Sequence, residues 1–176
     1  MNFKTKRSIL ILTTFVMIAL LICCIGCKAA TGSQVGNKAT DFNLSTLTGE
    51  KVHLRDLEGK PVMFTFWTTG CGACIYQMPF VEAARDELKS NVTFIEINIA
   101  ESSYTITSFL DICPTTYHFT MDLPIVLDSD AATAIAYNIR YTPTNVIVDS
   151  SGVIQQIKIG AFRNTTAVLS ALSNVK

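Results

Sequence analysis

The chain has 176 residues, of which 49% are hydrophobic and 16% charged, and its 14 basic and 14 acidic side chains balance at neutral pH. This length suits one folded domain, and the charges form no basic stripe, which argues against nucleic acid as a partner. Beyond residue 27 the only cysteines are Cys71, Cys74 and Cys113, too few for a disulfide scaffold.

Residues 1–26 have the pattern of an export signal. Three basic residues precede an uncharged apolar run over 9–25, and small residues follow it. The basic residues are Lys4, Lys6 and Arg7. Because this run is only about 17 residues long, it is near the lower limit for a bilayer-spanning helix, so an uncleaved membrane anchor is the alternative.

The end of this run resembles a bacterial lipobox, with Cys24 at the position where that motif usually has Leu. The resemblance predicts cleavage before Cys27 and a lipid on its thiol. The alternative is that Cys23, Cys24 and Cys27 are merely small apolar residues of a signal helix. Lipid and anchor would both hold the domain at a membrane, outside the cytoplasm.

Removal of residues 1–26 would leave 11 basic against 14 acidic residues, a net charge of −3. Residues 27–37 are mostly small and polar and predict a short tether, so the folded domain is expected over 38–176.

The hydrophobic pattern predicts alternating strands and helices. In chain order these are a hairpin over 41–54 that turns at 48–50, a buried strand 62–67, a helix 72–89, a buried strand 92–99, a helix 102–113, a strand 124–127, a helix 131–137, a hairpin of 145–148 and 153–159, and a last helix capped by Asn164. This order indicates an α/β fold with a central mixed β-sheet flanked by helices.

Cys71 and Cys74 are the strongest functional signal. They follow an apolar strand and a small-residue turn, where a helix begins, and a helix N-terminus favours a thiolate. A zinc site would need two further ligands, but His53 and His118 form no ligand-spaced pair. A disulfide between the two cysteines would close too short a loop to stabilise the fold much. The pair therefore predicts a dithiol redox centre, with no metal and no cofactor besides its own disulfide.

Several motifs in this order resemble the extracytoplasmic thioredoxin-like proteins of the TlpA/ResA group, which are related to the AhpC/TSA redoxins. The motifs are Gly36-x-x-Ala39-x-Asp41-Phe42, Gly59-Lys60-Pro61, Phe66-Trp67-x-x-x-Cys71-x-x-Cys74 with Met78-Pro79, Leu127-Asp128, Tyr141-Thr142-Pro143-Thr144 and Val148-Asp149-x-x-Gly152. The resemblance spans about residues 35–175. It implies a thioredoxin-like fold with an N-terminal β-hairpin extension.

The resemblance also implies roles for the site residues. Cys71 would be the nucleophile and Cys74 the resolving thiol. The Thr142–Pro143 bond would be cis beside them and would present the Thr142 backbone to a client peptide. An ordinary trans proline at a strand start is the alternative. Trp67 would shield the sulfurs from water, or would simply end a core strand.

Four positions depart from thioredoxins. Gly70 replaces the usual Trp, which predicts weaker apolar contact with partners, and Gly72-Ala73 between the cysteines lacks the common proline and leaves the residue 73 N–H free. Thr65 occupies the position of the buried acid of thioredoxins, and Gln77 occupies that of a Glu found in many cytochrome-maturation members of the group. Neither side chain can relay a proton to Cys74.

This draws attention to Glu96, in the middle of a predicted buried strand. If it faces the same side as Thr65, burial would raise its pKa and suit proton exchange with Cys74. The alternative is a Glu side chain that reaches solvent or pairs with Lys or Arg.

Two further residues are less informative. Cys113 could be a third redox thiol, a disulfide partner or a small packing residue, and packing is the usual role of a single cysteine on a helix. His118 lies in a long connection over 115–121, for which a surface loop is the prediction and a segment that borders the site is the alternative.

Together these features predict a membrane-tethered, extracytoplasmic thiol–disulfide oxidoreductase that reduces protein disulfides. The family resemblance implies disulfide-bearing exported proteins as partners, cytochrome c precursors as one client, and a membrane protein as electron donor. The alternative is a thiol peroxidase of the peroxiredoxin type. Its motif Pro-x-x-x-Thr-x-x-Cys matches Thr68 and Cys71, but Phe64 replaces the proline. A binding module that kept only the fold is disfavoured by the intact cysteines and Pro143.

Overall fold

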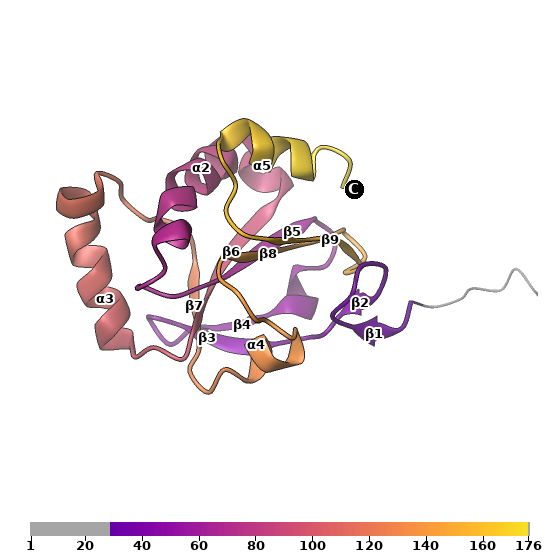
Figure 1. Ribbon diagram of the computed structural model, residues 1–176. Coiled ribbons are helices and arrows are strands. Elements are labelled where there is room, and N and C mark those ends of the chain that lie inside the picture. Colours follow the sequence, from indigo (N-terminus) through magenta and orange to yellow (C-terminus); the bar gives the residue numbers. More distant parts are fainter. Residues whose placement is uncertain (1–28, 176) are drawn as a thin grey trace, which may run out of the picture.

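A seven-stranded mixed sheet forms the centre of the computed structural model, which describes residues 29–175 (Figure 1). Its strands are ordered β4-β3-β7-β6-β5-β8-β9. Their bounds are β3 Asn43–Thr46, β4 Lys51–His53, β5 Val62–Trp67, β6 Thr93–Ile99, β7 Ile125–Asp128, β8 Thr144–Val148 and β9 Ile154–Ile159. The inner strands β5, β6 and β7 are parallel, and all other neighbours are antiparallel. The predicted mixed sheet is confirmed.

Helices cover both faces of this sheet. In Figure 1, α2 (Gly72–Leu88) and α5 (Thr165–Leu172) lie together above it, α4 (Ala132–Ala136) lies below it, and α3 (Ser103–Ile112) stands at one side. Asn164 caps α5 as predicted, since its side chain accepts a hydrogen bond from the Ala167 N–H at 2.8 Å. A 3₁₀ turn, η1 (Leu54–Leu57), follows β4.

The central strand β5 divides the core in two. All six of its residues are buried, and their side chains alternate between the two faces. Val62, Phe64 and Phe66 belong to the core on the α4 side, where Phe64 contacts Tyr137 edge to face at 5.3 Å. Met63 and Trp67 belong to the cores under α2, α3 and α5. A strand buried on both faces explains the continuous apolar run in the sequence.

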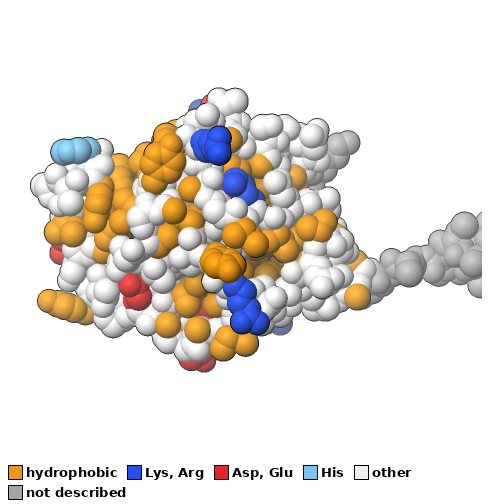
Figure 2. All heavy atoms as spheres, viewed as in Figure 1, with side chains coloured by type: hydrophobic (Ala, Val, Ile, Leu, Met, Phe, Trp, Pro, Cys, Tyr) orange, Lys and Arg blue, Asp and Glu red, His pale blue; other side chains and the backbone are white. Residues whose placement is uncertain are grey.

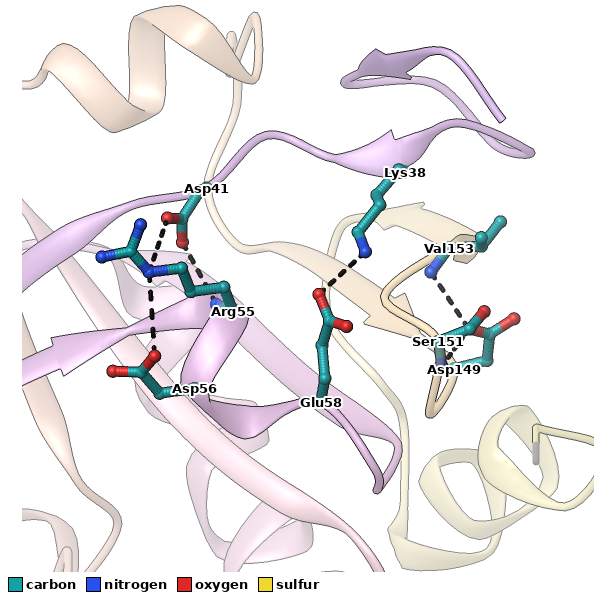
Figure 3. A network of polar contacts seen from close by, with 8 residues as sticks. All are labelled: Lys38, Asp41, Arg55, Asp56, Glu58, Asp149, Ser151 and Val153. Carbon is teal, nitrogen blue, oxygen red and sulfur yellow. Dashed lines mark hydrogen bonds and ion pairs between the residues drawn. The ribbon is translucent and has the colours of Figure 1, made fainter. Parts of the chain in front are cut away.

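The N-terminal hairpin β3–β4 pairs with the outer parallel strand β7 through β3, with Ser45 opposite Leu127. It therefore widens the sheet at this side, which confirms the predicted extension. Asp41, just before the hairpin, accepts a hydrogen bond from the Arg55 N–H at 3.1 Å (Figure 3).

Part of the segment predicted to be a tether is folded onto the domain. Strand β1 (Thr31–Gly32) pairs with β2 (Lys38–Ala39), and the Gly36 N–H donates to the Ile154 carbonyl at 2.8 Å. The Lys38 ammonium points toward the Glu58 carboxylate, 2.9 Å away (Figure 3). The folded part therefore begins ahead of residue 38, where the sequence placed the boundary.

The predicted export signal and Cys27 lie outside the described residues. Within residues 29–175, none of the helices has the length and apolar character needed to cross a membrane.

Candidate active site

Cys71 and Cys74 form a disulfide where β5 leads into α2, with their Cα atoms 5.2 Å apart. Cys71 is the N-cap residue of the helix, and its sulfur accepts a hydrogen bond from the Cys74 N–H at 3.1 Å. Cys71 is half-buried and Cys74 is fully buried. Of the two sulfurs, that of Cys71 is therefore the one a client can reach.

The start of α2 suits a thiolate at Cys71. The first turn contains no acidic residue, and Gly72 and Ala73 are exposed small residues. No acidic residue within the first turn therefore opposes the positive end of the helix dipole and the free N–H groups. After reduction, this environment favours the ionised form of the Cys71 thiol.

The Thr142–Pro143 peptide bond is cis, as the resemblance implied. It enters β8, which runs antiparallel to β5 with Thr144 opposite Phe66. This register brings the cis bond to the end of β5 from which the cysteine loop departs. Thr142 is half-buried, so its backbone is within reach of a molecule bound at the surface.

Trp67 lies in the core beside the cysteine pair. It ends β5 in the core, fully buried, and belongs to the same apolar cluster as Cys74 and Met78. Its ring packs against Phe109 of α3 at 5.6 Å, and its Nε1 has no hydrogen-bond partner within residues 29–175. It therefore forms part of the apolar floor beneath Cys74.

Glu96 is buried, with 1% of its surface exposed, which excludes the alternative of a Glu side chain that reaches solvent. It lies opposite Thr65 on the neighbouring strand β5, on the side covered by α2. Its Oε2 has no hydrogen-bond partner among the described residues, and no ion pair joins it there to Lys or Arg. Burial raises the pKa of Glu96 well above its ordinary value; the neighbouring Thr65 hydroxyl opposes the shift, and the charge of Glu82 adds to it.

A neutral network joins β5, β8 and α2 beside this acid. The Thr65 hydroxyl donates to Asn145 Oδ1 at 3.0 Å, and Gln77 Nε2 donates to the same oxygen at 2.9 Å. Gln77 lies one turn after Cys74 on the buried side of α2 and also accepts from the Phe162 N–H at 3.1 Å. Asn145 was missed by the sequence analysis, since an Asn in an apolar strand gives no local sign of its partners.

Glu101 was also missed. Its carboxylate accepts hydrogen bonds from the Thr69 N–H at 2.8 Å, the Thr69 hydroxyl at 2.7 Å and Asn98 Nδ2 at 2.7 Å. It thereby holds the loop that precedes Cys71. A signal was available, because Glu101 follows β6 and the carboxyl ends of parallel strands meet at one edge of a sheet.

Cys113 is buried and unpaired, and burial raises the pKa of its thiol, which agrees with a packing residue. The connection around His118 does border the site. It begins with a π-helical turn, η3 (Cys113–Tyr117), and Tyr117 and Phe119 line a groove that also includes Gly70 and Gly72. His118 itself is exposed.

The burial of Glu96 predicts an unusual pH dependence of stability. Above the ordinary Glu pKa of 4.5 the unfolded chain loses a proton that the folded chain keeps. The free energy of unfolding of the wild type should therefore fall relative to Glu96→Gln as pH rises, by up to about 1.4 kcal/mol per pH unit until the folded-state pKa is reached.

Urea unfolding of both proteins between about pH 5 and pH 8 measures this difference. Glu87→Gln, at an exposed position of α2, is the matched control for the loss of one carboxylate and should show a constant difference from wild type. A constant difference for Glu96→Gln as well would contradict the burial of a neutral acid.

Comparison with known proteins agrees with this site. The family model described as Redoxin matches residues 34–175. The thioredoxin-like protein YneN of Bacillus subtilis is 37% identical over 136 residues, which cover 76% of each chain. The thiol–disulfide oxidoreductase ResA of Halalkalibacterium halodurans is 34% identical over 129 residues, covering 73% of this chain and 70% of its own.

Solved structures share the fold. A putative thiol:disulfide interchange protein DsbE from Chlorobium tepidum matches with a TM-score of 0.66 at 23% identity, over 82% of this chain and 99% of that one. The exposed lipoprotein thioredoxin Etrx1 of Streptococcus pneumoniae matches with a TM-score of 0.64 at 22% identity, over 77% of this chain and 100% of its own. With the Cys71–Cys74 disulfide at its centre, the chain belongs to the redoxin family and is a thiol–disulfide oxidoreductase of the ResA type.

Proposed function

We propose that this protein is a membrane-tethered, extracytoplasmic reductant of protein disulfides that acts through Cys71 and Cys74. The observation that carries the proposal is the asymmetry of the pair. One sulfur is accessible at a helix N-terminus and the other is buried behind it. Such an arrangement suits one thiol for attack and the other for release.

The reaction would take place in two exchanges. The Cys71 thiolate attacks one sulfur of a client disulfide, that bond breaks, and the other client sulfur leaves as a thiolate. The Cys74 thiolate then attacks the Cys71 sulfur, releases the second client thiolate and closes the Cys71–Cys74 disulfide. Two electrons pass to the client, and the two thiolates it gains take up protons.

Glu96 is proposed to exchange a proton with Cys74 during the second step. A buried thiol must be deprotonated before it can attack, and a buried acid with a raised pKa is suited to accept and return that proton. Two observations support this: Glu96 lies on the sheet face covered by α2, and the Thr65–Asn145–Gln77 network joins its strand neighbour to the turn after Cys74.

The direction, the location and the partners are proposals of the same kind. The direction is supported by the lack of His in Gly72-Ala73, because strong oxidants carry His-containing dipeptides. The clients would be disulfide-bearing exported proteins, with cytochrome c precursors among them, and a membrane protein would return electrons to the pair. A tether outside the cytoplasm is supported by the lipobox-like Cys27 and by the lipoprotein thioredoxin that shares the fold.

The first prediction concerns the roles of the two cysteines. Cys71 should have a thiol pKa below the reference value of about 8.5 and should be alkylated first. With an insulin-type protein disulfide, Cys74→Ser should accumulate a mixed disulfide that mass spectrometry detects, and Cys71→Ser should not. The reverse pattern would exchange the roles, and faster turnover of hydrogen peroxide than of the protein disulfide would favour a peroxidase.

The second prediction concerns the direction of electron flow. Equilibration with a dithiothreitol or glutathione series should give a reduction potential near about −270 mV, as for thioredoxin. A value near about −120 mV would indicate an oxidant instead and would overturn the reductant proposal.

The same titration at several pH values tests Glu96. Ionisation of the Cys71 thiol bends the plot of potential against pH in both proteins; if Glu96 exchanges a proton with Cys74, the wild-type plot should show an additional bend that the Glu96→Gln plot lacks. Parallel plots would remove the relay and leave the roles of the cysteines intact.

The third prediction concerns location. Expressed in bacteria, the protein should fractionate with membranes and begin at Cys27 with lipid attached, as shown by mass spectrometry of the N-terminal peptide. The Cys27→Ala variant should carry no lipid, because alanine has no thiol to which the lipid could be attached. An unmodified N-terminus on protein recovered from the soluble fraction would refute the tether.

A further inference from the structure

A groove of about 580 Å³ opens beside the disulfide, between α2 and the connection that follows α3. Figure 2 shows hydrophobic side chains gathered on this face, over the start of α2 and toward α3. The lining residues are Thr69, Gly70, Gly72, Ile75, Tyr76, Pro79, Tyr117 and Phe119. The lining contains no charged side chain, although 16% of the chain is charged.

The aromatic wall of this groove is anchored to the core under the cysteines. The Tyr117 ring packs on Phe109 at 5.8 Å, and Phe109 packs on Trp67 at 5.6 Å. A few residues further on, the Asp122 and Leu123 N–H groups both donate to the buried Glu82 carboxylate, at 2.7 and 2.9 Å. The connection is therefore held to α2 and α3 at both ends of the wall.

The opposite wall comes from α2 itself. Tyr76 is 55% exposed, yet its ring packs on Phe80 at 5.3 Å and its hydroxyl donates to the Arg163 carbonyl at 3.3 Å. An aromatic ring that is both exposed and held in place offers contact area to a partner at little entropic cost.

Between the two walls, the groove is lined by Gly70 and Gly72, which have no side chain. A Cβ built on Gly70 or on Gly72 meets no atom within 4 Å, so the space above both residues is open. Both residues flank Cys71, whose sulfur must be approached in line by a sulfur of the client. A client chain can therefore come close to the protein backbone here.

We propose that this groove binds the part of a client polypeptide next to its reacting cysteine, and that it selects clients with an apolar or aromatic side chain at that place. The inference rests on the proposed disulfide exchange at Cys71. Because the reacting sulfur of the client must contact the Cys71 sulfur, the client residues next to that cysteine necessarily lie over the surface beside Cys71. An uncharged aromatic groove accommodates an apolar side chain there and disfavours a charged one, which would lose its water without gaining a partner.

The test uses the rate of mixed-disulfide formation by the reduced Cys74→Ser variant, followed by mass spectrometry. The substrates are symmetric disulfides of two short peptides that differ only in the residues flanking Cys, Phe in one and Ser in the other. Symmetric disulfides make both sulfurs equivalent, so only the flanking residues differ. The Phe peptide should react about tenfold faster than the Ser peptide, the size of discrimination that one apolar contact supports.

Three additional substitutions show whether the groove is responsible for this ratio. Tyr117→Ser and Phe119→Ser should each lower the Phe-to-Ser rate ratio severalfold. Gly70→Leu should do the same by extending a side chain into the groove from a position where a Cβ meets no atom within 4 Å. Tyr104→Ser, at a 79% exposed tyrosine outside the groove, is the matched control and should keep the wild-type ratio.

Bis(2-hydroxyethyl) disulfide, which has no flanking side chain, serves to separate the two proposals. If the Cys74→Ser parent does not react with it, the proposed exchange at Cys71 fails. If the parent reacts but shows no preference for the Phe peptide, or if the groove variants keep the ratio, only the groove proposal is overturned. Retention of the ratio in Phe119→Ser or Gly70→Leu would be decisive even if Tyr117→Ser did not fold.

Discussion

The passage of the chain from a fully buried strand to the start of a long helix is the constraint on which the site depends. Strand β5 (Val62–Trp67) is held between β6 and β8, so its end has one position and one direction. Helix α2 starts five residues later, with Cys71 as its cap. The helix N-terminus, the buried second sulfur and the nearby turn at Pro143 all follow from this one junction. A redox pair placed there requires little else from the rest of the fold.

The buried polar residues beside this junction are unusual for a core. Thr65, Gln77 and Asn145 satisfy one another with hydrogen bonds, whereas Glu96 keeps an oxygen without a partner among the described residues. Burying an acid in this way destabilises a fold unless the acid stays protonated, and it is then a store for one proton. The proposed proton exchange with Cys74 would use such a store, which would give a physical reason for an acid at position 96.

The surface around the disulfide has two different sides. Toward Pro143 it offers a half-buried backbone, which suits pairing with any extended peptide. Toward Tyr117 and Phe119 it offers aromatic side chains, which suit particular residues of a client. Gly70 predicted weak apolar contact with partners; in the proposed groove this contact would come instead from the connection after α3. Backbone pairing and side-chain selection would thus be divided between the two sides of Cys71.

The sequence by itself determined the order of strands and helices, the redox pair and the family, because hydrophobic periodicity and the spacing of cysteines are local properties of the chain. It could not determine whether Glu96 reaches solvent, since alternation shows that a strand is buried but not what covers it. Asn145 with Gln77, and Glu101 with Thr69, are contacts between segments that lie 68 and 32 residues apart. The groove likewise joins the start of α2 to Tyr117 and Phe119. Only the tertiary structure decided these features, because each depends on which distant side chains the sheet and helices bring together.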